Sequence, residues 1–133
     1  MIRRLDVKTH RHDELVDITH LVQNIVSELA INEGVCTVFV PHTTAAITIQ
    51  ENDDPNVPAD IIDGLRRLIP DKGMLSYKHF EENAPAHLKA ALMGTSETIL
   101  VENGKLQLGR WQSIFLCEFD GPRHRQVLVR VAA

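Results

Sequence analysis

The segment HTTAAITIQENDD, which begins at His42, carries the side chains of this chain that are best suited to chemistry. An imidazole and the hydroxyls of Thr43 and Thr44 stand at one end. Such groups transfer protons, bind a metal, or hold a phosphate through hydroxyl and backbone N–H donors. At the other end, Glu51 and Asp53 offer the oxygen ligands that Mg²⁺ favours in proteins.

Each of these groups also has an ordinary structural role. An aspartate before a proline is common capping chemistry at a helix start, and threonine is a favoured strand residue. A strand advances about 3.3 Å per residue, which separates His42 from Glu51 by roughly 30 Å if the segment is unbent. The two ends therefore cannot share one site within an unbent strand. Either the chain turns back after the threonines, or each end meets partners from other segments or subunits.

The chain has seven histidines, and three of them fall where predicted elements begin or end. His42, His79 and His87 would suit zinc or a similar transition metal if the fold brings them together. No HExxH, CxxC or close histidine pair on a helix supports that site, so scattered polar histidines are the alternative. His10 and His12 are interpreted as surface residues at the end of a strand.

Three further side chains are candidates for binding a substrate or an anion. Arg123 follows the DGP turn, and its guanidinium offers planar, bidentate donors to a phosphate, although an arginine in a turn is more often solvated. Asn83 and Lys89 lie on either side of His87 in the segment NAPAHLKAALMG. The chain has neither GxGxxG nor GxxxxGK[ST], so neither a dinucleotide fold nor a phosphate loop is predicted.

One domain must position these side chains, because 133 residues with 44% hydrophobic content form one core and are too few for two. Apolar residues recur at helical spacing from Ile18 to Leu29, with Asp17 as the expected cap. Prolines and early aspartates predict a second helix within 54–70. The segment NAPAHLKAALMG predicts a third helix, which ends at Gly94.

The remaining segments have the alternation and β-branched content of strands, and the Asn-Gly dipeptide at 103–104 predicts a hairpin. Six or seven strands and three helices without regular βαβ alternation predict an α+β fold with a mainly antiparallel sheet. Alternation places Cys117 on the same strand face as Phe115 and Phe119, which favours a packed thiol. Trp111 is expected in the core, where replacement by alanine would cost about 3–5 kcal/mol.

Composition restricts the classes of partner. Charged residues make up 24% of the chain and the formal net charge is −4, so no basic surface suited to nucleic acid or an anionic membrane is expected. The apolar runs are far shorter than the roughly 20 residues that cross a bilayer, and the N-terminus lacks the apolar core of a signal peptide. A cytoplasmic location follows, with Cys36 and Cys117 reduced.

Four blocks of the sequence are specific enough to indicate a family. They are GVCTVFVPHTTAAITIQENDDPNV, NAPAHLKAALMG, ILVENGKLQLGRWQSI and FLCEFDGPRHRQVLV, together with Ser96, Gly104, Gly109, Trp111 and Gln112. Over nearly its whole length the chain resembles the YjbQ family, also called the secondary thiamine-phosphate synthase family. Two positions depart from the family pattern. Arg110 stands where the family usually has threonine, and Pro85 replaces the first histidine of the motif NAHAH, while His87 keeps the second.

The resemblance implies an α+β fold assembled as a homotrimer, polar pockets near subunit boundaries, and a secondary ability to form thiamine phosphate. That reaction joins a pyrimidine methyl diphosphate to a thiazole phosphate, and pyrophosphate leaves. Mg²⁺ on carboxylates, with basic side chains, would neutralise the diphosphate, and His42 or His87 would donate a proton or bind a metal. The residues that offer these charges are Glu51, Asp53, Asp54, Lys89 and Arg123. The alternative is a metal- or small-ligand-binding homotrimer without a dedicated catalytic role.

Overall fold

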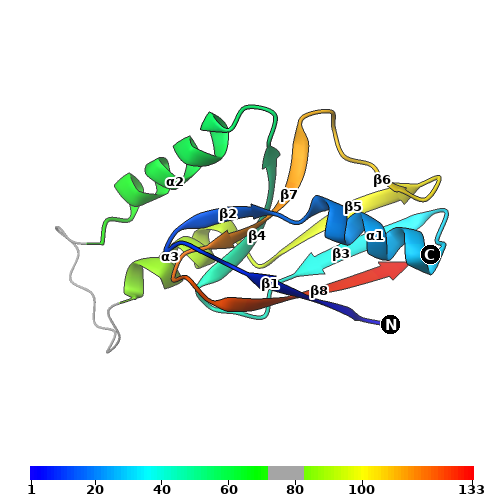
Figure 1. Ribbon diagram of the computed structural model, residues 1–133, viewed down its shortest axis with the longest axis horizontal. Coiled ribbons are helices and arrows are strands. Elements are labelled where there is room, and N and C mark those ends of the chain that lie inside the picture. Colours follow the sequence, from blue (N-terminus) through cyan, green and yellow to red (C-terminus); the bar gives the residue numbers. More distant parts are fainter. Residues whose placement is uncertain (72–82) are drawn as a thin grey trace.

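The computed structural model describes residues 1–71 and 83–133, and within them it contains eight strands and three helices (Figure 1). The elements in chain order are β1 (Arg3–Lys8), β2 (Glu14–Asp17), α1 (Thr19–Leu29), β3 (Gly34–Phe39), β4 (Ala45–Glu51), α2 (Asn56–Leu68), α3 (Ala84–Met93), β5 (Ser96–Glu102), β6 (Lys105–Leu106), β7 (Gln112–Glu118) and β8 (His124–Ala132). Every pairing between strands is antiparallel. The predicted α+β class with a mainly antiparallel sheet is confirmed.

The strands form two sheets with a core between them. The large sheet has the order β1-β8-β3-β5-β6, and the small sheet has the order β2-β7-β4. Apolar side chains of α1 fill the first core together with the facing sides of both sheets. A second core lies on the other side of the small sheet, where α2 and α3 pack against β4 and β7 (Figure 1). The small sheet is therefore covered on both faces.

Strand β7 contributes side chains to both cores. Ile114 and Leu116 belong to the first core, whereas Phe115 and Cys117 belong to the second. A strand buried on both faces reads as a continuous apolar run, which is what IFLC is. Phe119 joins the same second core, so the predicted grouping of Cys117 with the two phenylalanines is confirmed.

Both cysteine thiols are free and buried. Burial raises the pKa of Cys36 to about 11 and that of Cys117 to about 12. The thiolate is the nucleophilic form of cysteine, and burial disfavours it in both residues. The thiols therefore serve as small apolar core groups.

The predicted helix ends are confirmed by local hydrogen bonds. The Asp17 carboxylate accepts the Thr19 N–H at 2.9 Å just before the first turn of α1, and the Asp54 carboxylate accepts the Asn56 N–H at the start of α2. Each bond satisfies a donor that has no partner within the helix. Helix α3 has a proline in its first turn and ends at Gly94, whose φ of 94° is open to glycine.

Two local predictions have different outcomes. The hairpin between β5 and β6 turns at Asn103 and Gly104, with φ of 53° and 73°, so it is confirmed. Trp111 is 47% exposed, with the Arg110 guanidinium 4.7 Å from its ring centroid, so its predicted place in the core is wrong. It stands before β7 begins, and the alternation of that strand does not reach it.

Strand β2 is not among the predicted elements, because four residues are too few to establish an alternating pattern. It is an edge strand that pairs only with β7. Its register places Glu14 opposite Glu118 and brings the segment before it to the end of β7. No helix in the described residues is long and apolar enough to span a bilayer.

Candidate functional site

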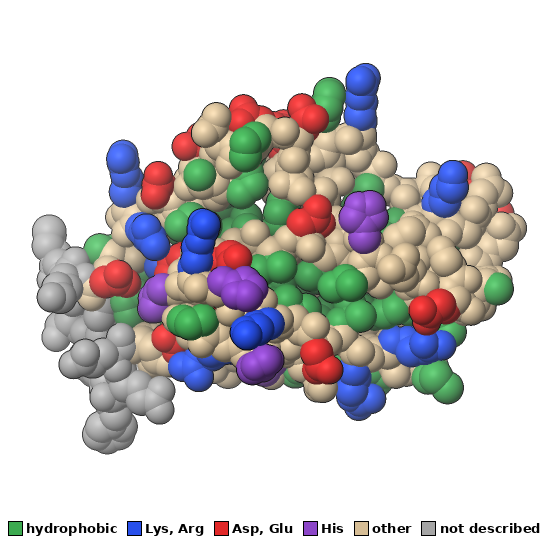
Figure 2. All heavy atoms as spheres, in the orientation of Figure 1, with side chains coloured by type: hydrophobic (Ala, Val, Ile, Leu, Met, Phe, Trp, Pro, Cys, Tyr) green, Lys and Arg blue, Asp and Glu red, His purple; other side chains and the backbone are tan. Residues whose placement is uncertain are grey.

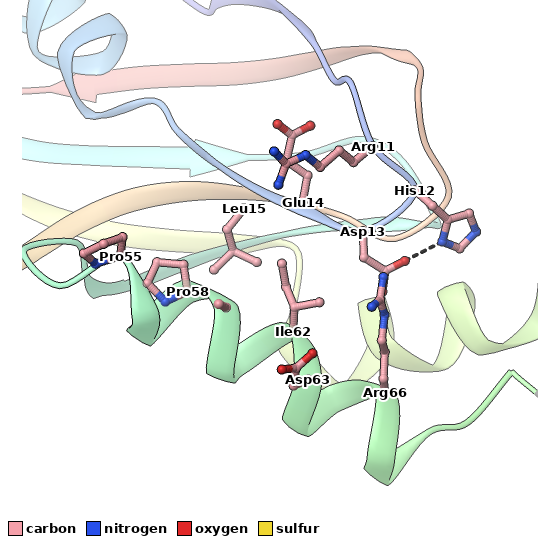
Figure 3. A pocket seen from close by; sticks show the side chains of 11 residues that line it. Arg11, His12, Asp13, Glu14, Leu15, Pro55, Pro58, Ile62, Asp63 and Arg66 are labelled. Carbon is pink, nitrogen blue, oxygen red and sulfur yellow. Dashed lines mark hydrogen bonds and ion pairs between the residues drawn. The ribbon is translucent and has the colours of Figure 1, made fainter.

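A cleft of about 460 Å³ opens between helix α2 and the segment that leads into β2. Figure 3 shows Arg11, His12, Asp13 and Glu14 on one side, and Arg66 on the other, reaching from α2 toward Asp13. The remaining lining residues are Leu15, Pro55, Pro58, Ala59, Ile62 and Asp63. In Figure 2, basic, acidic and histidine side chains gather beneath α2, at the left of the view. The cleft thus combines an apolar wall with several charges.

Asp13 is the centre of the charged group, and its side chain is 2% exposed. The Lys89 ammonium donates to one carboxylate oxygen at 2.9 Å, and Arg66 Nε lies 3.6 Å from the same oxygen. His12 Nδ1 is hydrogen-bonded to the other oxygen (Figure 3). A buried carboxylate is stable only when paired, and the Lys89 and Arg66 charges together with the His12 hydrogen bond supply the pairing.

Lys89 reaches Asp13 from helix α3. Its side chain is 1% exposed, and the ammonium lies 5.8 Å from the centroid of the Phe119 ring. The helix itself is held by Ala86 and Ala90, whose small side chains allow it to approach the small sheet closely. Packing of α3 on the second core therefore places the ammonium behind Asp13, which lines the cleft.

Asp120 forms a second acidic centre beside the first. Asn83 Nδ2 donates to its carboxylate at 3.0 Å, Arg123 Nη2 does so at 2.9 Å, and His12 Nε2 lies 3.8 Å from its other oxygen. Burial alone would raise the pKa of Asp120, but the hydrogen bonds from Asn83 and Arg123 and the nearby positive charges hold it below its usual value. Asp120 is therefore an acceptor and a counter-charge.

Gly121 allows this turn to lie against the segment before β2. Its N–H donates to the His12 carbonyl at 3.0 Å. A Cβ atom at this position would come within 2.7 Å of the Glu118 side chain and would also collide with the Arg11 carbonyl. The turn after β7 and the His12 backbone are thus held together by a contact that only glycine permits.

A buried ion pair joins the ends of β7 and β8 next to these groups. Glu118 is fully buried and pairs with Arg125, which is 5% exposed. The Thr9 hydroxyl donates to Glu118 at 2.8 Å, and the N–H groups of Phe119 and Asp120 donate to its second oxygen. Arg125 also donates to the Thr44 hydroxyl at 2.8 Å. Both carboxylate oxygens therefore have partners within the fold.

His42, the first candidate by sequence, is linked to β8. The Gln126 N–H donates to its Nε2 at 3.0 Å. Burial lowers the pKa of His42, and the Arg125 charge adds to that effect more than Glu118 opposes it. The imidazole is therefore held neutral with Nε2 as an acceptor, which leaves this nitrogen unable to bind a metal.

The structure brings some predicted residues together and separates others. Asn83 and Arg123 meet at Asp120, and Lys89 belongs to the adjacent group around Asp13. Thr44 is buried and bound to Arg125, whereas Thr43 is exposed. His87 lies half-buried in the first turn of α3.

Glu51 lies at the far end of β4 from the threonines, because Glu51 pairs with Gln112 whereas Ala45 pairs with Glu118. Asp53 is exposed beyond that end. The predicted separation of the two polar ends of HTTAAITIQENDD is confirmed. The acidic end lies away from the Asp13 and Asp120 groups.

The predicted three-histidine metal site is not decided, since His79 lies outside the described residues. Among residues 1–71 and 83–133, no three histidine, cysteine or acidic side chains are arranged to hold a metal ion. The described residues by themselves therefore do not fit a zinc site.

The groups around Asp13, Asp120 and Glu118 contain six ionisable side chains that are absent from the sequence prediction. They are His12, Asp13, Arg66, Glu118, Asp120 and Arg125. Two features of the sequence could have indicated some of them. His12 and Asp13 are adjacent titratable residues, and Glu118 directly follows the apolar run IFLC, where a buried carboxylate requires a partner. Which partners they find depends on contacts between distant segments, which no spacing reveals.

A family model described as UPF0047 protein YjbQ-like matches residues 3–133. Among individual relatives, a UPF0047 protein of Methanocaldococcus jannaschii is 46% identical, with 98% of this chain and 94% of the relative covered. The UPF0047 protein YugU of Bacillus subtilis is 42% identical, with 98% of each chain covered.

Two crystal structures confirm the fold at the level of the whole chain. A protein from Clostridium acetobutylicum described as YjbQ/UPF0047 family is 49% identical, with a TM-score of 0.94 over 98% of this chain and 99% of that one. A protein of unknown function from Sulfolobus solfataricus, described as YbjQ-like, is 38% identical, with a TM-score of 0.92 over 98% and 95% of the two chains.

Proposed function

The chain belongs to the YjbQ-like UPF0047 family, and from that premise and the geometry of its cleft we propose that it binds a small phosphorylated substrate and has a secondary thiamine-phosphate synthase activity. The observation that carries this proposal is the cleft between α2 and the segment before β2. Its volume of about 460 Å³ is within the usual range for small-molecule sites. The substrates would be a pyrimidine methyl diphosphate and a thiazole phosphate.

Two arginines of the cleft suit a diphosphate. Arg66 is 51% exposed and contacts Asp13 only at 3.6 Å, and Arg11 forms no ion pair with any described residue. A guanidinium in this state has donors available for a phosphate oxygen, and a bidentate pair is strong and directional. The apolar wall from Leu15, Pro58 and Ile62 offers a surface for a heterocycle.

Glu14 and Asp63 also line the cleft, and their negative charges repel a diphosphate. Mg²⁺ bound jointly by a carboxylate and substrate oxygens would offset that repulsion, as is common at phosphate-handling sites. The proposal therefore includes a divalent cation that arrives with the diphosphate. Glu14 and Asp63 replace Glu51 and Asp53 as its expected ligands, since the latter pair lies away from the cleft.

The first test measures pyrophosphate binding by calorimetry in the presence of Mg²⁺. We expect wild type to bind, and the Arg66→Gln variant to bind about tenfold more weakly or worse, because a hydrogen bond to a charged group contributes about 1.5–3 kcal/mol. Arg67→Gln is the matched control, since Arg67 is the next residue of α2, is also exposed, and does not line the cleft. Equal affinities of Arg66→Gln and wild type would contradict the placement of the diphosphate.

Turnover separates the two candidate functions. Formation of thiamine phosphate from the two substrates supports the enzyme. Pyrophosphate binding without turnover supports instead a small-ligand-binding homotrimer without a catalytic role.

We also propose that copies of this chain associate through the outer face of the large sheet, as a homotrimer. That face carries exposed apolar side chains, including Val35, Phe39 and Leu100, which are 40%, 39% and 64% exposed. Next to Phe39, a depression of about 240 Å³ is lined by Ile2 and Leu128, with Thr37, Val129 and Arg130. Contiguous apolar surface of this kind is typical of protein interfaces.

Light scattering measures the assembly directly. We expect a trimer for wild type and a monomer for Phe39→Glu, because a carboxylate buried at an apolar interface without a partner is strongly unfavourable. Asn24→Glu introduces the same side chain in α1, on the opposite side of the large sheet, and should remain a trimer. A Phe39→Glu trimer would contradict this interface.

A further inference from the structure

Three side chains form a continuous chain from the interior of the protein to the mouth of the cleft. The Lys89 ammonium is at the buried end, the Asp13 carboxylate is in the middle, and the His12 imidazole is at the outer end. Their side chains are 1%, 2% and 56% exposed, respectively. Only the last group of the three is accessible to a molecule in the cleft.

We propose that His12 is the proton-donating residue of the cleft, that Asp13 sets its tautomer, and that Lys89 is a positioning residue for Asp13. The proposal rests on the proposed function, since it names the group that protonates the departing diphosphate. It differs from the sequence prediction, in which His42 or His87 has this role and His12 is a surface residue.

Asp13 determines which nitrogen of His12 is free to donate a proton. The carboxylate accepts a hydrogen bond from Nδ1–H, so in the neutral ring Nδ1 carries the proton and Nε2 is the acceptor. In the imidazolium, Nδ1–H remains bound to Asp13 and Nε2–H is the proton available for transfer. The carboxylate thus orients the ring, and the histidine carries the proton that a general acid transfers.

Lys89 keeps Asp13 in one orientation. Its ammonium donates to Oδ2, while Oδ1 is left to accept from His12. Arg66 Nε, 3.6 Å from Oδ2, contacts the same side of the carboxylate as Lys89. Because the ammonium is buried, it does not itself reach substrate, and its action is transmitted through Asp13.

The other charged groups around His12 are consistent with this role. Asp120 Oδ1 is 3.8 Å from His12 Nε2, too far for a hydrogen bond, so Nε2 is not committed to a protein partner there. The second oxygen of Asp120 is taken by Asn83 and Arg123. His42 is a poorer donor, because its Nε2 already accepts the Gln126 N–H.

The transfer step balances without an added reagent. The bond between the pyrimidine methylene carbon and the diphosphate oxygen breaks, and its electron pair goes to the diphosphate. The thiazole nitrogen forms the new bond to the methylene carbon with its own lone pair. The Nε2 proton of His12 moves to the departing oxygen, and solvent returns a proton to His12 after the product leaves.

The tautomer is tested on the free protein by two-bond nitrogen-15 correlation of the histidine rings at a pH where His12 is neutral. We expect the Nδ1–H form for His12 in wild type. In Asp13→Asn, the amide oxygen can accept from Lys89 while its NH₂ group points at His12, so the ring should change to the Nε2–H form. An Nε2–H ring in wild type would overturn the role of Asp13.

Turnover tests His12 itself. We expect His12→Gln to form thiamine phosphate about 10²- to 10⁴-fold more slowly at saturating substrate, which is the usual contribution of general acid catalysis. His12 is largely exposed, so this variant should fold even if Asp13→Asn does not. His10→Gln is the matched control, because His10 is an exposed neighbour that does not line the cleft.

The outcomes distinguish this inference from the function on which it rests. Wild type that does not bind pyrophosphate overturns the proposed function, and the role of His12 falls with it. Wild type that binds and turns over, with His12→Gln equally fast, overturns only the role of His12. Slow turnover of His12→Gln at saturating substrate, and normal turnover of His10→Gln, supports the proposal.

Discussion

Replacing Arg125 with methionine should lower the free energy of unfolding by about 3–5 kcal/mol, because it leaves a buried carboxylate without its counter-charge. Glu118 is fully buried, and Arg125 donates a hydrogen bond to each of its two carboxylate oxygens. The methionine is unbranched like arginine and supplies no donor. The Thr44 hydroxyl would also be left without the Arg125 donor.

Urea denaturation at one fixed protein concentration measures this change. Arg67→Met is the matched control, since Arg67 is exposed on α2 and forms no ion pair within the described residues, and it should change stability by less than about 0.5 kcal/mol. Glu118→Gln combined with Arg125→Met should be more stable than Arg125→Met alone, because the unpaired charge is gone. An Arg125→Met protein within about 1 kcal/mol of wild type would show that the pair is not a major contributor to folding.

Replacing Phe115 with alanine should cost about 3–5 kcal/mol, the usual range for a large aromatic side chain in a packed core. Its side chain is buried, with the residue 2% exposed, and lies between the small sheet and the helices α2 and α3. The same replacement at Trp111 should cost less than about 1 kcal/mol, since its ring stacks with the Arg110 guanidinium at the surface, and exposed cation–π pairs contribute about 0.5–1 kcal/mol.

Thermal and urea unfolding of the two variants, measured in parallel, test whether Phe115 rather than Trp111 is the buried aromatic residue. A Trp111→Ala protein that is destabilised as much as Phe115→Ala would mean that the tryptophan is covered in the assembled protein. That result would contradict its placement as an exposed side chain. A mild effect of Phe115→Ala would instead contradict the second core.

The fold was largely predictable because its signals are local. The apolar stripe of α1, the prolines and aspartates around α2, and the Asn-Gly turn at 103–104 each depend on neighbours within a few residues. The two errors occur where local signals are weakest. Strand β2 is too short to show alternation, and Trp111 stands one residue outside the strand whose pattern suggested its burial.

The candidate site was predictable only in part. Asn83, Lys89 and Arg123 were identified from residue type and from their place at the ends of elements, and all three belong to the charged groups around Asp13 and Asp120. His12 was interpreted as a surface residue, which describes its exposure but not its neighbours. The threonine–histidine segment contributes Thr44 to a buried network rather than to the cleft.

The helices, most strands, the α+β class and the separation of the two ends of HTTAAITIQENDD follow from local sequence, because periodicity and turn chemistry are properties of contiguous residues. Which charges meet depends instead on how distant segments pack. Lys89 and Asp13 are 76 positions apart, and they pair because α3 packs on the small sheet and β2 pairs with β7. Burial then makes their pairing obligatory, since a lone charge at either position would be far less stable than in water.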